Sequence, residues 1–248
     1  MSGHSKWATI KHKKGATDAK RAKVFAKLIR QVEVAAREGG ADPEMNPALR
    51  TMFQKARDQS VPLDTIEKAI KRGAGQLEGV AYESITYEGY ASGGVALLVD
   101  VLTDNRNRSG SDVRSVFTKR GGSVAEPGAV AWQFDRKGTM LVDGSVAEDD
   151  LMLAAIDAGA EDITREGDYW RVTTGPTDLH AVRTAVEEAG YKVEEPDLTR
   201  VAQNLVTLDD KSAAKKVLDL VDALDDLDDV QAVHGNFDIT DEVLAELG

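Results

Sequence analysis

The pattern that most restricts the fold of this chain is an alternation of short strands and helices between residues 139 and 194. Runs rich in β-branched and aromatic residues predict strands, and apolar residues at every third or fourth position predict helices. The resulting order, βαββαβ, is typical of a ferredoxin-like domain. The predicted elements are a strand at 139–142, a helix at 148–158, strands at 162–165 and 169–174, a helix at 178–189 and a strand at 191–194.

A second unit of this kind is divided between the two sides of that segment. Before it, two predicted strands precede a helix that we expect to begin at Ser109, because Ser109-x-x-Asp112 resembles a capping box. After it, a strand, a helix and a strand supply the missing half. The predicted elements are strands at 85–90, 95–103 and 130–134, then a strand near 198–208, a helix at 212–224 and a strand at 230–234.

The N-terminal part predicts three helices. Gly39-Gly40 ends the first, Asn46-Pro47 begins the second with an N-cap and a proline, and Gly73 ends the third. We therefore predict an α+β fold, with an N-terminal three-helix bundle and two ferredoxin-like α/β domains, the third domain being inserted into the second. The predicted boundaries are 1–79 for a basic arm and helical bundle, 80–136 with 205–248 for the discontinuous α/β domain, and 137–204 for the inserted domain.

The charge of the chain is divided unevenly. The formal net charge of the 248 residues is −12. Residues 1–72 contain 16 basic and 8 acidic residues, a net charge of +8, whereas the remaining 15 basic and 35 acidic residues give −20. The basic part is attracted to phosphates and the acidic part is repelled by them. We therefore expect a molecule that contacts a polyanion on one side.

Residues 2–30 carry most of the positive charge, with nine Lys or Arg residues opposed by Asp18. Such a segment binds phosphates through counterion release, and Trp7 could stack on an unpaired base. From residue 20, apolar and basic residues fall on opposite faces of a helix, except Arg21, which lies over the apolar face near the helix start. The alternative is that the charged run is only a solvated surface. The candidate nucleic-acid contacts are Lys6, Trp7, Lys11, His12, Lys13, Lys14, Lys20, Arg21, Lys23, Lys27 and Arg30.

A second candidate contact is the segment Asp104-Asn105-Arg106-Asn107-Arg108. We place Arg106 and Arg108 just before a helix, where the helix dipole disfavours cations but a bound phosphate would favour them. The alternative is that the two arginines pair with Asp104, Asp112 or other nearby acids.

Three segments resemble one protein family. They are GHSKWATIKHKKGATDAKRAKVFAKLIR near the N-terminus, Tyr87-Glu88-Gly89-Tyr90, and Asp104 to Arg108 followed by Val113-Arg114. They are similar to the YebC/PmpR family, which includes mitochondrial translational activators of cytochrome oxidase subunit I. The resemblance implies a three-domain cytoplasmic protein that regulates gene expression through nucleic acid, and it adds Arg114 to the candidate contacts.

Several classes of protein are disfavoured. The four histidines have no metal-ligand spacing, and no Walker A, G-x-G-x-x-G or G-x-S-x-G motif is present. Asp225 to Asp229 lack the spacing of a calcium loop, so we interpret them as a solvated acidic helix end. There is no cysteine, and the longest apolar run, 95–99, cannot cross a bilayer. We expect a cytoplasmic protein without enzymatic activity, metal or cofactor, and a monomer because no coiled-coil pattern occurs.

Three functions remain open. The chain could bind promoter DNA as a transcriptional regulator, as family members are commonly described. It could instead bind ribosomal RNA as a translation factor and associate with the ribosome. The third predicted helix favours this alternative, because it is a poor recognition helix: its cations Lys68, Lys71 and Arg72 lie at its C-terminal end. Thirdly, it could be a scaffold that acts through its acidic domains without nucleic acid.

Overall fold

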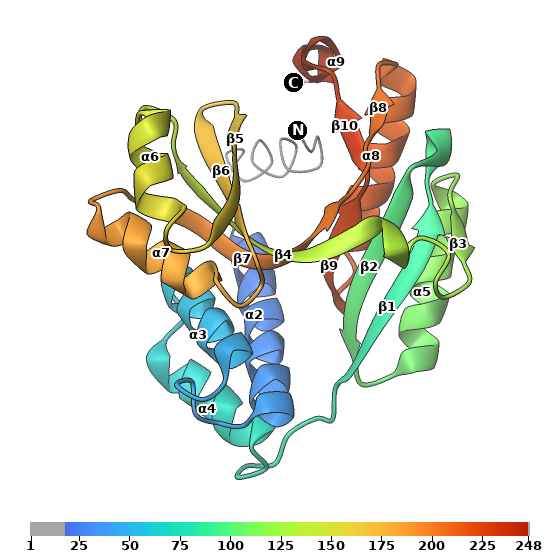
Figure 1. Cartoon of the computed structure of the whole chain (residues 1–248). Coiled ribbons are helices and arrows are strands. Elements are labelled where there is room, and N and C mark those ends of the chain that lie inside the picture. Colours follow the sequence, from blue (N-terminus) through green and yellow to red (C-terminus); the bar gives the residue numbers. More distant parts are fainter. Residues whose placement is uncertain (1–17, 248) are drawn as a thin grey trace. The chain divides into compact units, whose positions relative to one another are not determined.

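The structure, a computed structural model, describes residues 18–247 without the side chains of residues 18–20 and 241. The chain forms two compact units, each built from segments that lie far apart in the sequence (Figure 1). Unit 1 contains Ala35–Leu77 and Arg136–Arg200. Unit 2 contains residues 18–34, Glu78–Asp135 and 201–247.

One asparagine of unit 1 joins two of the N-terminal helices. Asn46 caps the second predicted helix as expected, because its Oδ1 accepts a hydrogen bond from the N–H of Leu49 at 3.0 Å. Its Nδ2 donates to the carbonyls of Ala35 and Gly40, both at 2.8 Å, and so ties the end of one helix to the start of the next. These helices are α2 (Asp18–Gly39), of which residues 35–39 belong to unit 1, and α3 (Pro47–Asp58). The third N-terminal helix, α4 (Leu63–Gly73), also lies in unit 1.

The second part of unit 1 has the predicted βαββαβ order. Its sheet has the strand order β5-β6-β4-β7, with β6 antiparallel to both β4 and β5. Apolar residues of the sheet, such as Met140 and Val172, are buried with Leu151 and Val182 of the two helices. The elements are β4 (Phe134–Asp143), α6 (Glu148–Ala155), β5 (Ala160–Glu166), β6 (Tyr169–Thr174), α7 (Leu179–Glu188) and β7 (Val193–Ala202).

The sheet of unit 2 is completed only after the inserted segment. Its order is β3-β1-β2-β9, and β9, which follows the insertion, pairs antiparallel with β2. The elements are β1 (Glu83–Tyr90), η1 (Ser92–Gly94), β2 (Ala96–Thr103), α5 (Arg106–Lys119), β3 (Ser123–Ala125), η2 (Ala131–Gln133), β8 (Val206–Leu208), α8 (Lys211–Asp225), β9 (Val230–Gly235), β10 (Phe237–Ile239) and α9 (Asp241–Leu247).

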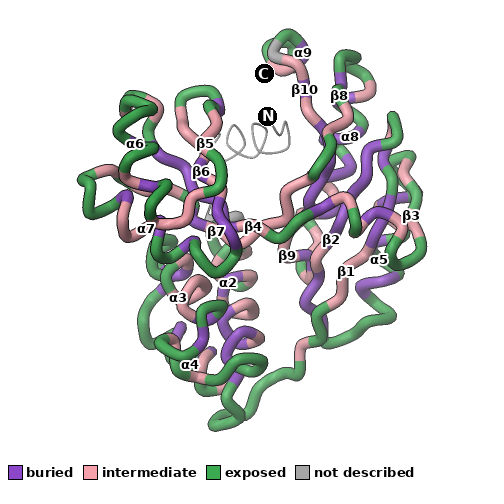
Figure 2. The backbone as a smooth tube through the Cα atoms, in the orientation of Figure 1, coloured by how far each residue is buried: buried purple, intermediate pink, exposed green. Residues whose placement is uncertain are grey.

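The core of unit 2 lies between its sheet and two helices. Leu97 and Val99 of β2 are buried with Phe117 of α5 and with Leu220 and Leu224 of α8. Figure 2 shows that buried residues follow the central strands of this sheet. No helix within residues 18–247 has the length and apolar character needed to cross a membrane.

Three predicted elements are wrong in detail. The helix expected at Ser109 begins three residues earlier, because Asn105 is the N-cap and its Oδ1 accepts from the N–H of Arg108 at 3.1 Å. The strand expected at 130–134 is replaced by the short 3-10 helix η2, and β4 begins at Phe134. The strand expected near 198–208 is divided into the end of β7 and β8.

The carboxylate of Glu88 explains the irregular backbone at η2. Glu88 is buried on the face of β1 opposite the helices. Its oxygens accept hydrogen bonds from the backbone N–H groups of Gly128, Val130 and Ala131 at 2.6, 2.6 and 2.8 Å. Since these donors are bound by a side chain, they are not available to a strand ladder.

Gly89, the next residue of β1, faces the helices and lies against Phe117. A Cβ atom at Gly89 would be 2.6 Å from the Phe117 ring and 2.7 Å from the carbonyl oxygen of Ser123. The absence of a side chain at this position therefore lets α5 and β3 approach β1 closely.

We expect Gly89→Ala to destabilise the fold by about 1–3 kcal/mol, because a methyl group would overpack this contact. Urea unfolding measures the effect, and Ser84→Ala, at an exposed position of the same strand, is the control. A loss no larger than that of the control would show that Phe117 can move aside.

Candidate nucleic-acid interface

The first half of α2 carries a row of three cations that belongs to unit 2. Lys23, Lys27 and Arg30 are spaced at i, i+4 and i+7, which places them on one face of the helix. Leu28 and Val32 are buried, as the apolar stripe predicts. The side chains of the three cations are only 29, 14 and 23% exposed. The cation row is therefore partly covered.

The acidic segment at the end of α8 covers the two lysines. Lys27 Nζ lies 2.9 Å from the Asp225 carboxylate and 3.1 Å from the carbonyl oxygen of the same residue. Lys23 donates to the carbonyl of Asp226 and lies 3.7 Å from its carboxylate. The C-terminal carbonyls of a helix are unpaired and carry partial negative charge. This helix end therefore offers two kinds of oxygen to each lysine.

Arg30 reaches the same segment farther along the turn. Its NH1 donates to the carbonyl of Asp228 at 2.7 Å and lies 3.4 Å from the Asp229 carboxylate. Its guanidinium also lies 5.6 Å from the ring centroid of Tyr82, within the range of a cation–π interaction. We refer to Asp225 to Asp229 as the acidic turn.

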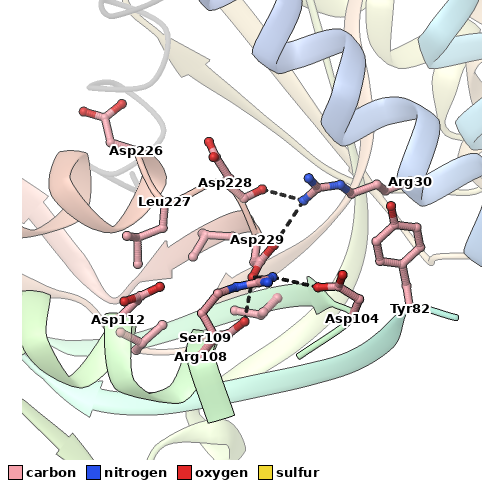
Figure 3. A pocket seen from close by; sticks show the side chains of 13 residues that line it. Arg30, Tyr82, Asp104, Arg108, Ser109, Asp112, Asp226, Leu227, Asp228 and Asp229 are labelled. Carbon is pink, nitrogen blue, oxygen red and sulfur yellow. Dashed lines mark hydrogen bonds and ion pairs between the residues drawn. The ribbon is translucent and has the colours of Figure 1, made fainter. Parts of the chain in front are cut away.

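The interpretation of the acidic turn as a solvated helix end is correct for two residues and wrong for a third. The side chains of Asp226 and Asp228 are 84 and 86% exposed, whereas that of Asp229 is 14% exposed. The carboxylate of Asp229 accepts hydrogen bonds from Arg108 and Ser109, both at 2.7 Å (Figure 3), and from Thr103 at 3.0 Å. Burial alone would raise the pKa of Asp229, but these hydrogen bonds outweigh burial and lower it.

Arg106 and Arg108 lie in the first turn of α5. The sequence predicts them just before the helix, but the helix begins at Arg106. Arg108 is 2.7 Å from Asp104 as well as from Asp229, and these carboxylates raise the pKa of its guanidinium. Arg106 NH1 is 3.0 Å from Glu83. The alternative of pairing with nearby acids therefore describes both arginines in this structure, and a phosphate would have to displace those acids.

A hollow of about 530 Å³ lies beside these groups in unit 2. Arg30 and Arg108 supply two positive charges, but carboxylates outnumber them in the lining (Figure 3). The hollow is therefore not a suitable phosphate pocket. Its ionisable lining residues are Arg30, Asp104, Arg108, Asp112, Asp226, Asp228 and Asp229, together with Tyr82.

The remaining candidate contacts are placed as follows. Arg21 stacks over Phe25 of its own helix, with 5.4 Å between the guanidinium carbon and the ring centroid. Arg114 is exposed on α5. The backbone of Lys20 is in α2, but its side chain is not described. The candidates that lie outside the described residues are Lys6, Trp7, Lys11, His12, Lys13 and Lys14.

We expect Asp229→Asn to lower the free energy of unfolding by about 2 kcal/mol, because hydrogen bonds to a charged acceptor are lost. The pKa of Asp229 is lowered in the folded state, so its contribution is present above the unfolded pKa and is lost as pH falls through the folded pKa. The difference between the two proteins should persist at neutral pH and shrink below about pH 4.

Urea titrations at several pH values measure this difference. Asp226→Asn, at an exposed position of the same turn, should change stability little. Equal effects of the two variants, or a difference that does not depend on pH, would contradict the role given to Asp229.

The chain is similar to known proteins over nearly its whole length. A family model described as TACO1/YebC protein N-terminal domain matches residues 5–76, and one described as TACO1/YebC second and third domain matches residues 82–237. A protein of Halothermothrix orenii is 53% identical over 250 residues, covering 100% of this chain and 99% of the relative. One of Rubrobacter xylanophilus is 56% identical over 249 residues, with the same coverage. Both are named probable transcriptional regulatory protein.

A solved structure agrees with the fold. The chain is similar to a conserved hypothetical protein of Aquifex aeolicus, known from a crystal structure, with a TM-score of 0.83 and 45% identity. The similarity covers 92% of this chain and 94% of that one. The resemblance inferred from the sequence motifs is thus confirmed, and the chain belongs to the TACO1/YebC family.

Proposed function

We propose that this protein regulates gene expression by binding nucleic acid, and that Lys23, Lys27 and Arg30 are part of the binding surface together with the basic segment that precedes them. The observation that carries the proposal is that each member of the cation row already contacts acidic-turn oxygens. Carboxylates and phosphates are bound by the same charge-assisted hydrogen bonds. The relatives' name, probable transcriptional regulatory protein, supports a regulatory role.

In this proposal the acidic turn and the nucleic acid compete for the same cations. The contacts to the turn are intramolecular and therefore always available. A polyanion gains in addition from the release of its condensed counterions when the row neutralises its phosphates. When nucleic acid binds, its phosphates replace the carboxylates and carbonyl oxygens of the acidic turn as partners of the cation row.

The type of nucleic acid gives two candidate functions. A DNA-binding transcriptional regulator agrees with the names of the relatives. An RNA-binding translation factor, acting on the ribosome, is favoured by α4. Its first turn contains Asp64 and no basic residue, and Lys68 pairs with Asp64 at 2.6 Å. Recognition helices contact base edges with residues near their N-terminus, so α4 is poorly suited to reading duplex DNA.

The remaining parts of the proposal follow from this role. The protein would act in the cytoplasm, as a monomer, and would need no catalytic residue, metal or cofactor. A scaffold that works without nucleic acid is the outcome if neither duplex DNA nor structured RNA binds at physiological salt.

We expect the combination Lys23→Gln, Lys27→Gln and Arg30→Gln to weaken binding to duplex DNA and structured RNA. If all three cations contact phosphates, the slope of log K against log salt should fall by about 2 to 3, since each contact contributes about 0.7 to 0.9. Titrations of both nucleic acids at several salt concentrations measure the slope.

The matched control neutralises three exposed cations of α3 and α4, with Arg57→Gln, Lys68→Gln and Lys71→Gln. Equal losses in the two triple variants would mean that only net charge matters. In the unmodified protein, a preference of about a thousandfold for one promoter over scrambled DNA would favour the transcriptional function. Structured RNA binding at least as tightly as DNA would favour the translational one.

Neutralising carboxylates of the acidic turn should strengthen the binding of nucleic acid. We expect Asp225→Asn, Asp226→Asn and Asp228→Asn together to raise the affinity for nucleic acid several-fold, because competition for the cation row is reduced. The control with the same change in net charge is Asp149→Asn, Asp150→Asn and Asp157→Asn, at exposed positions in unit 1. An equal gain in both variants would exclude local competition.

A further inference from the structure

Two exposed aromatic rings lie together in unit 2, away from the cation row. Trp132 of η2 is 67% exposed and Tyr90 at the end of β1 is 36% exposed. Both rings hydrogen-bond to the same carbonyl oxygen, that of Ala129: the indole N–H of Trp132 donates at 3.1 Å and the hydroxyl of Tyr90 at 3.4 Å.

The hydrogen bonds to Ala129 determine which ligand chemistry the rings can use. The indole N–H is a donor only, and it is already bound within the protein. The part of Trp132 that remains for a ligand is the π face of the indole. Such a surface suits stacking by a flat ring better than recognition of a polar group.

The loop that carries Trp132 is held in place before any ligand arrives. The carboxylate of Glu88 accepts from the N–H groups of Gly128, Val130 and Ala131, which lie on either side of Ala129 and directly before Trp132. An aromatic ring whose backbone is fixed in advance loses less conformational entropy when it binds. The buried glutamate thus maintains an exposed aromatic surface.

Two cations end the helix that leads into a turn beside the Tyr90 backbone. Lys119 and Arg120 are exposed at the end of α5. The following turn lies against Tyr90, because a Cβ at Gly122 would be 2.8 Å from the carbonyl oxygen of Tyr90. Two exposed acids, Glu126 and Asp135, are also close in sequence, and Asp135 accepts from Gln203 at 3.1 Å. Single-stranded nucleic acid is bound by aromatic side chains on which its bases stack, together with cations that contact its backbone.

We propose that Trp132 and Tyr90 form a stacking site for an unpaired nucleobase. This inference rests on the proposed nucleic-acid function and names a second contact, at the end of the β1–β2 hairpin opposite Thr103, which bonds to the acidic turn. Bases in a duplex have their faces covered by neighbouring pairs, so the site discriminates in favour of unpaired strands.

The test uses a protein in which Trp132 is the sole tryptophan, made by Trp7→Phe and Trp170→Phe. A 12-nucleotide single-stranded RNA should quench the fluorescence of Trp132 saturably, and the corresponding RNA duplex should quench it much less. Trp132→Ala should weaken single-strand binding about five- to hundredfold. Trp132→Phe, which keeps a stacking face, should retain most of the affinity.

Two controls separate the possible results. Leu153→Ala removes a 78% exposed apolar side chain from unit 1 and should change binding less than twofold.

If the cation-row variant loses RNA affinity while Trp132→Ala does not and no quenching occurs, the stacking site is excluded and the proposed function stands. If neither RNA nor DNA binds the unmodified protein, both proposals fail. Unchanged urea unfolding of Trp132→Ala confirms that a lost affinity is not a loss of folding.

Discussion

The carboxylate of Asp229 is the contact on which the geometry of the candidate interface depends. It lies where the acidic turn passes into β9, and it binds Arg108, Ser109 and Thr103 at the start of α5 and the end of β2. A carboxylate with so little exposed surface requires several donors to offset its desolvation. With these donors in place, the position of the acidic turn is fixed relative to the sheet. Arg30 then meets a turn of defined shape.

This arrangement explains how a basic N-terminal part and an acidic remainder can belong to one protein. Part of the positive charge of α2 is matched by Asp225, Asp226 and Asp228 within unit 2. Ion pairs whose side chains are partly exposed are individually weak and are screened by salt. They are therefore strong enough to order the cations and weak enough to be replaced by a polyanion that carries many charges.

The sequence predicts the regular parts of the fold because their signals are local. The N-cap at Asn46 and the order of strands and helices between residues 139 and 194 follow from residues a few positions apart. The features that the sequence does not predict depend on contacts between residues far apart in the chain. The Glu88 carboxylate reaches Val130 from 42 positions away, and the predicted strand there gives way to a turn. The sequence likewise identifies Lys27 as a candidate contact but carries no signal for its partner Asp225, 198 positions away. At the start of α5, Asn105 and Ser109 are both suitable caps, and Ser109 is instead buried against Asp229.

Glu88 and Asp229 have the same physical role in two places. Each is a largely buried carboxylate whose oxygens accept at least three hydrogen bonds, and each fixes an irregular segment beside the sheet of unit 2. Such a carboxylate is costly to bury and therefore stabilises only the one backbone geometry that satisfies it. One of these segments presents acids to the cation row, and the other presents Trp132 to solvent. Since phosphate binding and base stacking tolerate little displacement of the groups involved, both proposed contacts depend on acids that need not touch the nucleic acid at all.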